Sequence, residues 1–261
     1  MNAVCVNLLD PRQALEAVLA RLEEKRAFTL FTLNLDHVVK LRTSAEFRAC
    51  YADADFVSAD GWPIVRYLRK RGAAAVRTTG ADLTLPLCEA AARAGVGVFI
   101  IGPRAPVQDR AVDKLRETIP RLDIAGTDAS IVDPRNAAAL DELARRLRAS
   151  GARLCFVCLG APKQEMTAQA LKARCPGVGF ICVGAALDFI SGDVVRAPRF
   201  VQKIGMEWAW RLASDPWRLA PRYMRCAEVF VLIALHRLPL VLRAQPAATF
   251  AGGRNVGSLR G

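Results

Sequence analysis

Polar side chains that could perform chemistry follow the first two strand-like runs of the sequence. Thr32 and Asn34 lie two residues apart at the end of the apolar run FTLFTLN, so they share one face near the carboxyl end of a strand. Asp60 ends the next such run, DFVSADG. Burial raises the proton affinity of a carboxylate and suits it to general-base catalysis. A turn aspartate that caps a helix beginning near Pro63 fits the same position, and both interpretations stay open.

Three later apolar runs end in a glycine turn that leads into a helix or loop. The turns are IIGPRAP at Gly102, CLGAPKQE at Gly160 and CVGAALDF at Gly184. They lack the GxGxxG spacing of a dinucleotide site and the GxxxxGK[ST] pattern of a P-loop. A helix beginning near Pro162 would place Lys163 and Gln164 at its positive N-terminal end, where free N–H groups bind phosphate. An ordinary strand-to-helix connection explains a single glycine turn equally well.

The sequence offers no convincing set of metal ligands. The DAD tripeptide at residues 53–55 resembles the DxD motif of many sugar-nucleotide transferases, but it precedes its strand and should lie at the opposite edge of the sheet. Cys155 and Cys158 form a CxxC within a strand-like run, where an offset of three places them on opposite faces. The chain has only two histidines, His37 and His236. We therefore expect neither a metal ion nor another cofactor.

The elements that must position these residues alternate along the chain. Strand-like runs are separated by segments with the apolar spacing of amphipathic helices, the first of which begins at Pro11 with Asp10 as its N-cap. The segment DHVVKLRTSAEFRACYA, residues 36–52, is predicted as another helix. Alternation of this kind is typical of a mostly parallel sheet with helices on both faces. We predict an α/β, Rossmann-like fold in which the carboxyl ends of the strands line one crevice.

Composition indicates a globular protein whose partners are anionic. The 261 residues are 52% hydrophobic and 24% charged, which excludes a disordered, collagenous or coiled-coil chain. A net charge of +12 indicates nucleic acid, an acidic membrane or a phosphorylated substrate as partner, although a basic surface also serves solubility alone. The N-terminus lacks the pattern of a signal peptide, so we expect the eight cysteines to stay reduced in the cytoplasm.

Basic and aromatic residues concentrate beyond Gly192, in a combination that fits phosphate binding beside an interfacial surface. The apolar run from Val229 to Leu242 is too short to span a bilayer, so we expect a helix that lies on the membrane or docks on the core. A basic helical hairpin that completes the fold is the alternative. The expected parts are a catalytic α/β domain over residues 1–195, a membrane-associating helical appendage over 196–243 and a disordered tail over 244–261.

Seven motifs in sequence carry a likeness to a known family. They are TLNLDHV, ADG, RTTGADL, GAPKQE, VGAALDFISG, RAP, and GMEWAWRL followed by DPWRLAPRY. Over about residues 28–225 the chain resembles the WecG/TagA/CpsF glycosyltransferases, glycosyltransferase family 26. The resemblance implies an inverting, metal-independent transferase that moves a hexose, of the N-acetylmannosamine type or another, from a UDP-sugar to an undecaprenyl-diphosphate-linked sugar in cell-surface polysaccharide synthesis. It also implies peripheral association with the cytoplasmic face of the plasma membrane.

The resemblance implies roles for individual residues. Asp60 matches the proposed catalytic base, and the expected catalytic set is completed by Asn34, Gln164 and Arg77. Thr32 and Asp188 match substrate-binding residues of the family, and Arg211, Arg218 and Arg222 match its lipid-diphosphate-binding arginines. The glycine turns and the residues beside them add Gly102, Gly160, Lys163, Glu165 and Gly184 to the expected substrate-binding set. Pro221 stands where the family usually has one of a pair of arginines, which leaves the number of phosphate-binding arginines open.

Two other functions use some of the same features. A phosphatase or phosphotransferase would use the anion-binding turns, but it needs a metal cluster or covalent nucleophile that the sequence does not show. A non-catalytic nucleotide- or nucleic-acid-binding protein is the alternative from another class. Nucleic acid would require basic and aromatic residues across the core surface. Because they concentrate near the C-terminus instead, we expect no nucleic-acid partner; a homo-oligomer stays possible.

Overall fold

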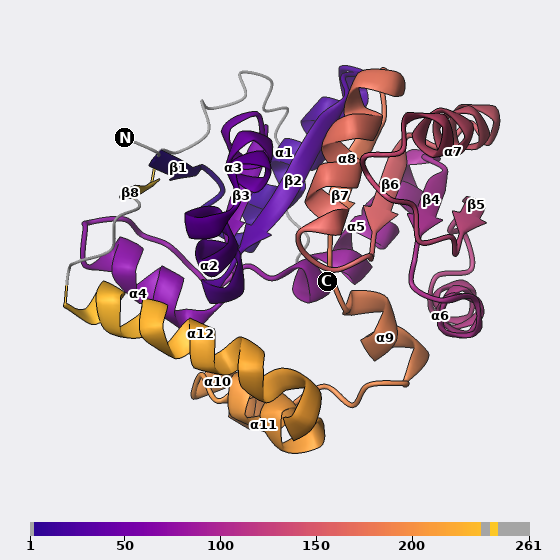
Figure 1. The fold of residues 1–261 in the computed structure, drawn as a ribbon. Coiled ribbons are helices and arrows are strands. Elements are labelled where there is room, and N and C mark those ends of the chain that lie inside the picture. Colours follow the sequence, from indigo (N-terminus) through magenta and orange to yellow (C-terminus); the bar gives the residue numbers. More distant parts are fainter. Residues whose placement is uncertain (1–2, 236–240, 245–261) are drawn as a thin grey trace, which may run out of the picture.

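The computed structural model describes residues 3–235 and 241–244. Within them, the main sheet is entirely parallel and has helices on both faces (Figure 1). In spatial order its strands are β3 (Phe56–Ala59), β2 (Phe28–Leu33), β7 (Gly179–Cys182), β6 (Leu154–Val157), β4 (Val98–Ile101) and β5 (Ile124–Asp128). This arrangement confirms the predicted Rossmann-like α/β fold and brings the carboxyl ends of the strands to one edge.

The helices on each face follow from the apolar side chains that they bury. On one face, the first core lies under α2 (Leu35–Thr43), α3 (Ala45–Ala52), α4 (Trp62–Arg69), α7 (Ala137–Ala149) and α8 (Lys163–Arg174). On the other face, the second core lies under α1 (Pro11–Glu23), α5 (Gly80–Ala94), α6 (Ala105–Thr118) and α9 (Ala186–Ser191). Covering both faces buries the central strands, as their unbroken apolar sequences require.

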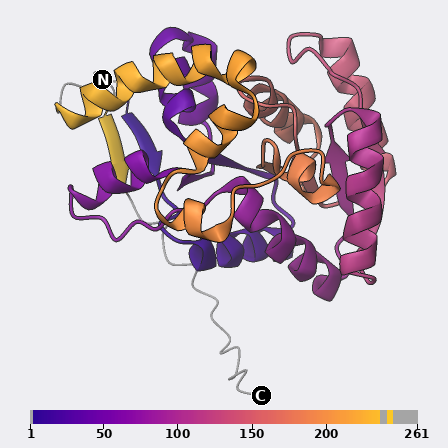
Figure 2. The same cartoon turned by 90° about the horizontal axis from the view of Figure 1, so that it is seen from below.

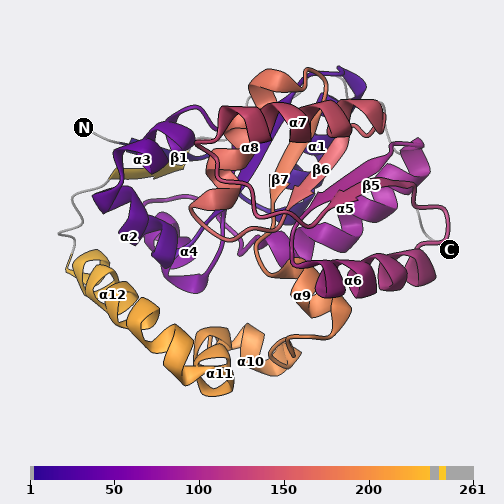
Figure 3. The same ribbon diagram turned by 45° about the vertical axis from the view of Figure 1, so that its right-hand side comes forward.

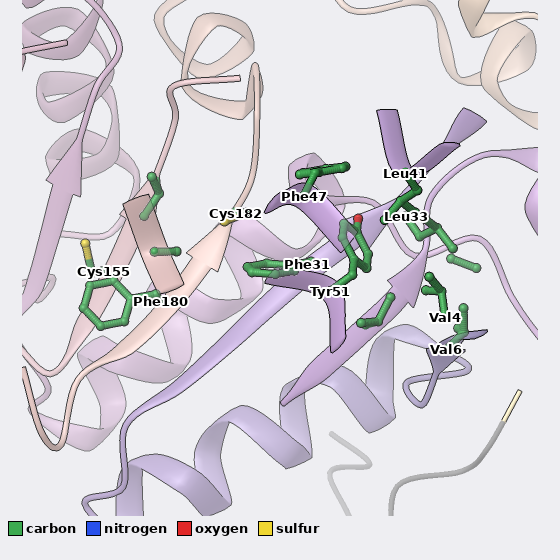
Figure 4. Close-up of a cluster of buried hydrophobic side chains, with 14 of the residues drawn as sticks. Val4, Val6, Phe31, Leu33, Leu41, Phe47, Tyr51, Cys155, Phe180 and Cys182 are labelled. Carbon is green, nitrogen blue, oxygen red and sulfur yellow. The ribbon is translucent and has the colours of Figure 1, made fainter. Parts of the chain in front are cut away.

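Successive strand residues alternate between the two cores. Phe31 belongs to the first core, where its ring centroid lies 5.3 Å from that of Tyr51 (Figure 4), whereas the neighbouring Leu30 belongs to the second core. Cys155 and Cys158 likewise fall in different cores. The predicted separation of the two thiols is confirmed, and they cannot share a metal ion.

Side-chain caps decide where helices begin. Asp10 accepts a hydrogen bond from the Gln13 N–H at 2.8 Å, which confirms the predicted start of α1. Ser44 accepts one from the Phe47 N–H at 3.1 Å and so starts α3. The prediction of a single helix over residues 36–52 is therefore wrong, because Ser44 ends α2 and caps the next helix.

The C-terminal helices form an arch along the edge of the core. We use the name C-terminal arch for α10 (Arg199–Lys203), α11 (Glu207–Ser214) and α12 (Pro216–Ala234). Figure 3 shows it as a layer beside the core, and Figure 2 shows it lying in front of the core when the molecule is seen from below. Its last helix packs on α2 and buries Val229 and Ile233 in the first core. One face of α12 is thus docked, as one of the two expected arrangements requires.

Two short strands outside the main sheet were not foreseen from the sequence. β1 (Ala3–Val6) pairs in parallel with β8 (Val241–Ala244), so the two ends of the described chain meet. The prediction of an apolar helix reaching Leu242 is wrong, because α12 ends at Ala234 and Leu242 is a buried strand residue. The predicted disordered tail lies outside the described residues from position 245 onward. None of the described helices has the length and apolarity needed to cross a bilayer.

Candidate active site

The carboxyl ends of neighbouring strands bring the predicted residues to one edge of the sheet. Asp60 follows β3, Asn34 follows β2, and the Gly184 turn follows β7. The Gly160 turn and Gln164 follow β6, which pairs with β7. Residues far apart in the sequence therefore meet where α/β sheets bind their ligands.

Asp60 is a partly buried carboxyl that caps no helix. Its backbone N–H donates to the Leu33 carbonyl at 2.8 Å, which extends the pairing of β3 with β2. The N-cap of α4 is Gly61, whose φ is 106°, and no side chain caps that helix. Burial raises the pKa of Asp60 to about 7, although the positive charge of Arg77 opposes the shift. The helix-cap interpretation is thereby removed, and a carboxyl with this pKa can accept a proton near neutral pH.

Arg77 lies on a segment that runs alongside β3 and is hydrogen-bonded to it. The Thr78 N–H donates to the Ala59 carbonyl at 2.8 Å, and the Ser58 hydroxyl donates to the Thr78 carbonyl at 3.0 Å. These bonds hold the backbone of Arg77 beside β3, the strand that Asp60 follows. The RTT sequence thus positions a guanidinium next to the carboxyl, which the motif alone could not show.

Four half-buried charges next to Asp60 form a closed ring, which we call the ion-pair ring. The Arg77 guanidinium donates to Glu207 at 3.1 Å and to Asp82 at 3.3 Å. Arg196 closes the ring, 2.6 Å from Asp82 and 3.7 Å from Glu207. Because Glu207 belongs to α11 and Asp82 to α5, the ring joins the C-terminal arch to the core. The sequence analysis gave Asp82, Arg196 and Glu207 no role in the site, although each lies in one of the seven motifs.

The amides of Asn34 and Gln164 both commit their oxygens to backbone N–H groups. Asn34 Oδ1 accepts from the His37 N–H at 3.1 Å and caps α2. Gln164 Oε1 accepts from the Gly184 N–H at 3.1 Å. Among the described residues, Asn34 keeps both of its amide N–H donors for another partner and Gln164 keeps one, and such donors favour a ligand rich in acceptor oxygens. Thr32 lies at the end of β2 with only 5% of its surface exposed.

Glu165 is completely buried, so the predicted direct contact with substrate gains no support from the structure. Its Oε1 accepts a 2.7 Å hydrogen bond from Gln164 Nε2, and its Oε2 has no partner among the described residues. Burial raises the pKa of Glu165 to about 7. His37 Nε2 lies 3.8 Å from Glu165 Oε1, but burial lowers the pKa of His37 to about 3. The imidazole is therefore neutral, and its Nδ1 lies 2.6 Å from the Tyr51 hydroxyl instead.

The glycine turns differ in what surrounds them. Gly160 and Gly184 have left-handed φ values of 72° and 58°, and a Cβ added to either would meet no atom within 4 Å. Their backbones are therefore open to a ligand, and Lys163 is exposed close to the first of them. Gly102 is different, because an added Cβ would lie 2.8 Å from the Cys158 carbonyl oxygen. Close packing explains that glycine, so the predicted substrate contact at Gly102 gains no support.

Arg211 and Asp188 lie together on the α9 side of the edge. Arg211 is stacked over Phe189, with its guanidinium carbon 5.7 Å from the ring centroid. Burial raises the pKa of Asp188, while Arg211 and Arg218 lower it. The field of Arg211 also reaches Asp60, whose pKa it lowers. These two predicted residues therefore belong to the same neighbourhood as the candidate base.

The other two predicted lipid-diphosphate arginines have different surroundings. Arg218 is exposed near the start of α12 and pairs with Asp215. Arg222 pairs with Asp36 of α2 at 3.2 Å. Burial favours protonation of Asp36, but Arg222 and Lys40 outweigh it and hold the pKa below its usual value. Arg222 thus anchors the arch, which leaves Arg211 and Arg218 better placed to meet a diphosphate.

The described residues do not form a metal site at the carboxyl edge of the sheet, where Asp60 lies. Asp55, the second acid of the DAD tripeptide, accepts from the Thr29 N–H at 3.0 Å and pairs with Lys172 at 2.8 Å. Because Thr29 is near the amino end of β2, the tripeptide lies at the opposite edge of the sheet, as predicted. Within residues 3–235 and 241–244, no group of three or more His, Cys, Asp or Glu side chains could hold a metal ion.

Comparison with known protein families adds an independent finding. The sequence of residues 2–242 matches the model of the family described as Glycosyl transferase WecG/TagA/CpsF family. The match covers nearly the whole chain and extends beyond the motif-bearing region on both sides. It therefore includes the C-terminal arch as well as the sheet edge with Asp60.

Proposed function

The chain belongs to the WecG/TagA/CpsF glycosyltransferase family, and on this premise we propose that it transfers a hexose from a UDP-sugar to an undecaprenyl-diphosphate-linked sugar with inversion and without a metal ion. The family indicates a glycosyltransferase of cell-surface polysaccharide synthesis that uses a sugar nucleotide and a lipid-linked acceptor. The finer proposal rests mainly on one observation, the partly buried carboxyl of Asp60 with a pKa of about 7 beside Arg77.

Asp60 is the proposed general base. Inversion in one step requires a base that takes the proton of the acceptor hydroxyl while its oxygen attacks the anomeric carbon, opposite the departing UDP. The carboxylate form of Asp60 accepts that proton, the new C–O bond forms, and the electrons of the breaking C–O bond leave with the diphosphate. A positioned base of this kind contributes about 10²- to 10⁴-fold to the rate.

Arg77 is the proposed partner of the leaving diphosphate. Its guanidinium can place N–H donors on phosphate oxygens, and charge-assisted bonds of this type are the strong ones. The open backbone at Gly160, where the chain turns into α8, supports a second anion contact. The N–H donors of Asn34 and Gln164 would orient the oxygens of the donor sugar and the acceptor. Positioning by such contacts is worth several kcal/mol of barrier.

An outer face of the C-terminal arch supports the proposed membrane association. Trp217, Met224, Val231 and Leu235 recur at intervals of seven and four residues, so they form one stripe along α12, opposite the docked face. The exposed fractions of Trp217 and Met224 are 93% and 74%. Arg218 and Arg225 each follow a residue of this stripe and lie along one side of it. An apolar stripe with basic residues beside it fits the interface of an anionic bilayer, where a lipid-linked acceptor resides.

The proposal can be tested with purified protein, a panel of UDP-sugars and a short-chain polyprenyl-diphosphate-sugar acceptor. We expect UDP release that requires one donor and the acceptor together, persists in excess EDTA and gives a product of inverted anomeric configuration. Activity that is lost in EDTA and restored by Mg²⁺ or Mn²⁺ would contradict the metal-independent mechanism. Binding of UDP-sugar without transfer to any acceptor would instead support the non-catalytic alternative.

A further inference from the structure

Gln164 and Glu165, which are consecutive in α8, form a side-chain hydrogen bond that helix geometry does not normally allow. Residues at i and i+1 on a helix point in different directions and rarely meet. Gln164 and Glu165 nevertheless share a 2.7 Å hydrogen bond, and they expose only 3% and 0% of their surfaces. Their contact occurs in the first turn of α8, directly after the open Gly160 turn.

The partners of Gln164 determine which way its amide faces. The Gly184 N–H can only donate, so the atom 3.1 Å from it must be the amide oxygen. With the oxygen placed there, the atom 2.7 Å from Glu165 Oε1 is the amide nitrogen, which can only donate. The bond from the Gly184 N–H therefore fixes the orientation, Glu165 Oε1 accepts one amide N–H, and the other amide N–H has no acceptor among the described residues.

Besides the Gln164 bond, the Glu165 carboxyl has only weaker support in the described part of the chain, from its own backbone N–H and from the charge of Lys40, both of which lower its pKa less than Gln164 does. The neighbouring His37 is neutral and lies 3.8 Å from Glu165 Oε1, so it gives the carboxyl neither an ion pair nor a hydrogen bond. The second carboxyl oxygen has no partner in the described part of the chain. The hydrogen bond to Gln164 is therefore the main interaction of a costly buried group.

We propose that Glu165 is a positioning residue that locks the amide of Gln164 as a hydrogen-bond donor toward an acceptor oxygen of the substrate. This inference rests on the proposed transferase function and deepens it at one residue. The acceptor oxygen belongs either to the diphosphate of the donor or to a sugar ring substituent. Without Glu165, the amide nitrogen loses its fixed partner and the free N–H loses its direction.

The experiment compares two replacements of Glu165 with a matched control on the same helix. Glu165→Gln keeps an acceptor oxygen for the Gln164 amide, whereas Glu165→Met keeps similar bulk without one. Thr167→Val is the control, because Thr167 is fully buried on α8 and its hydroxyl has no partner among the described residues. We expect Glu165→Met to lower kcat about 10- to 100-fold, while Glu165→Gln and Thr167→Val retain most of the wild-type rate.

A double-mutant cycle separates positioning from a general structural role. If Glu165 acts through Gln164, Glu165→Met combined with Gln164→Met should be no slower than Gln164→Met alone, within about threefold. Additive losses, or a wild-type rate for Glu165→Met, would overturn the proposal. A second variant covers the case in which Glu165→Met does not fold. The exchanged pair Gln164→Glu/Glu165→Gln keeps a hydrogen bond between the two positions but removes the N–H donor at position 164. This variant should fold but should not transfer sugar. Normal transfer would contradict the proposal.

UDP binding identifies which substrate oxygen is involved. Weaker UDP binding in Gln164→Met and Glu165→Met would place the contact on the diphosphate, whereas unchanged UDP binding with lost transfer would place it on the sugar. Wild-type transfer and its loss in Asp60→Asn are measured alongside. If wild type transfers no sugar with any donor, the proposed function fails; if it does and the Glu165 variants behave additively, only this inference fails.

Discussion

Asp60 and Glu165 both have a pKa of about 7 because both are buried, but their charged neighbours differ. Arg77 lowers the pKa of Asp60, while Glu207 and Asp82 raise it. The pKa of Glu165 is lowered instead by hydrogen bonds from Gln164 and from its own backbone and by the charge of Lys40, while Asp36 raises it. The two carboxyls can therefore be distinguished by changing one neighbour at a time.

Asp60 should impose an acidic limb on the pH profile of transfer. The base must be deprotonated, so kcat/KM should fall as the pH drops below about 7 and level off above it. Initial rates of UDP release between pH 5 and 9, at substrate concentrations below KM, measure this limb. A profile that is flat from pH 5 to 8 would disagree with a base of this pKa.

The same carboxyl should make wild type less stable than an amide variant at neutral pH. The pKa of Asp60 is raised from 3.8 in the unfolded chain to about 7 in the fold, so the folded state binds the proton more tightly. The contribution of Asp60 to the free energy of unfolding is fully present below about pH 4 and is lost as the pH rises to about 7. Asp60→Asn should therefore have a higher Tm than wild type at pH 8, and the difference should be smaller at pH 5. Thermal unfolding at both pH values tests this, and an equal or lower Tm at pH 8 would not fit.

At the scale of elements, the ion-pair ring couples α11 to the site through Glu207. The carboxylate of Glu207 holds the Arg77 guanidinium at 3.1 Å and raises the pKa of Asp60. Diphosphate bound to Arg77 would compete with this carboxylate. The position of the C-terminal arch and the occupation of the site are therefore linked in the proposed mechanism.

Glu207→Gln should shift the acidic limb toward lower pH. Loss of the negative charge favours the ionised form of Asp60 and so lowers its pKa. Glu207 is not among the main influences on the pKa of Glu165. If Glu165 controlled the fall in rate at low pH, the midpoint of that fall would therefore not move in Glu207→Gln. The pH profile of the variant measures the shift; Glu142→Gln, an exposed carboxylate on α7 that pairs with Arg145, provides a control of the same chemistry.

The alternation of elements was readable from the sequence because it depends on local periodicity. The strands of the main sheet and the cap at Asp10 follow from apolar spacing and cap chemistry. β1 and β8 were missed because each is a short strand and, among the described residues, its pairing partner lies more than two hundred residues away. The break at Ser44 was missed because a serine within an apolar helical pattern does not itself say that it caps a second helix.

Only part of the site was readable in the same way. Strand ends followed by Asn34 and Asp60 could be recognised, because parallel strands place their carboxyl ends at one edge. The ion-pair ring could not, since Arg77 and Glu207 are 130 residues apart and meet only through the fold. Burial was equally hidden, and it changed the interpretation of Glu165 from a substrate contact to a support of Gln164.

For the molecule as a whole, membrane binding should depend on the outer stripe of α12. Removing the whole helix is a poor test, because Val229 and Ile233 are part of the first core. Point substitutions avoid this problem. Trp217→Ser with Met224→Ser should weaken binding to anionic liposomes about tenfold or more, by loss of exposed apolar area.

Co-sedimentation with liposomes that contain an anionic lipid measures this binding. Ile131→Ser is the matched control, because Ile131 is 65% exposed but lies outside the C-terminal arch. Added salt should release the wild-type protein, since the basic residues beside the stripe act through screened charges. Equal binding of the stripe variant and the control would argue against α12 as the membrane-facing element.

Asp60 is the proposed base of the sugar transfer. The most direct test of this role is the rate of UDP release by wild type and Asp60→Asn with donor and lipid-linked acceptor, together with the affinity of both proteins for the UDP-sugar. Because the amide keeps the shape of the carboxyl and cannot accept the proton, we predict a loss of about 10²- to 10⁴-fold in kcat with unchanged donor affinity. Retention of more than a third of the wild-type turnover by Asp60→Asn would contradict the account.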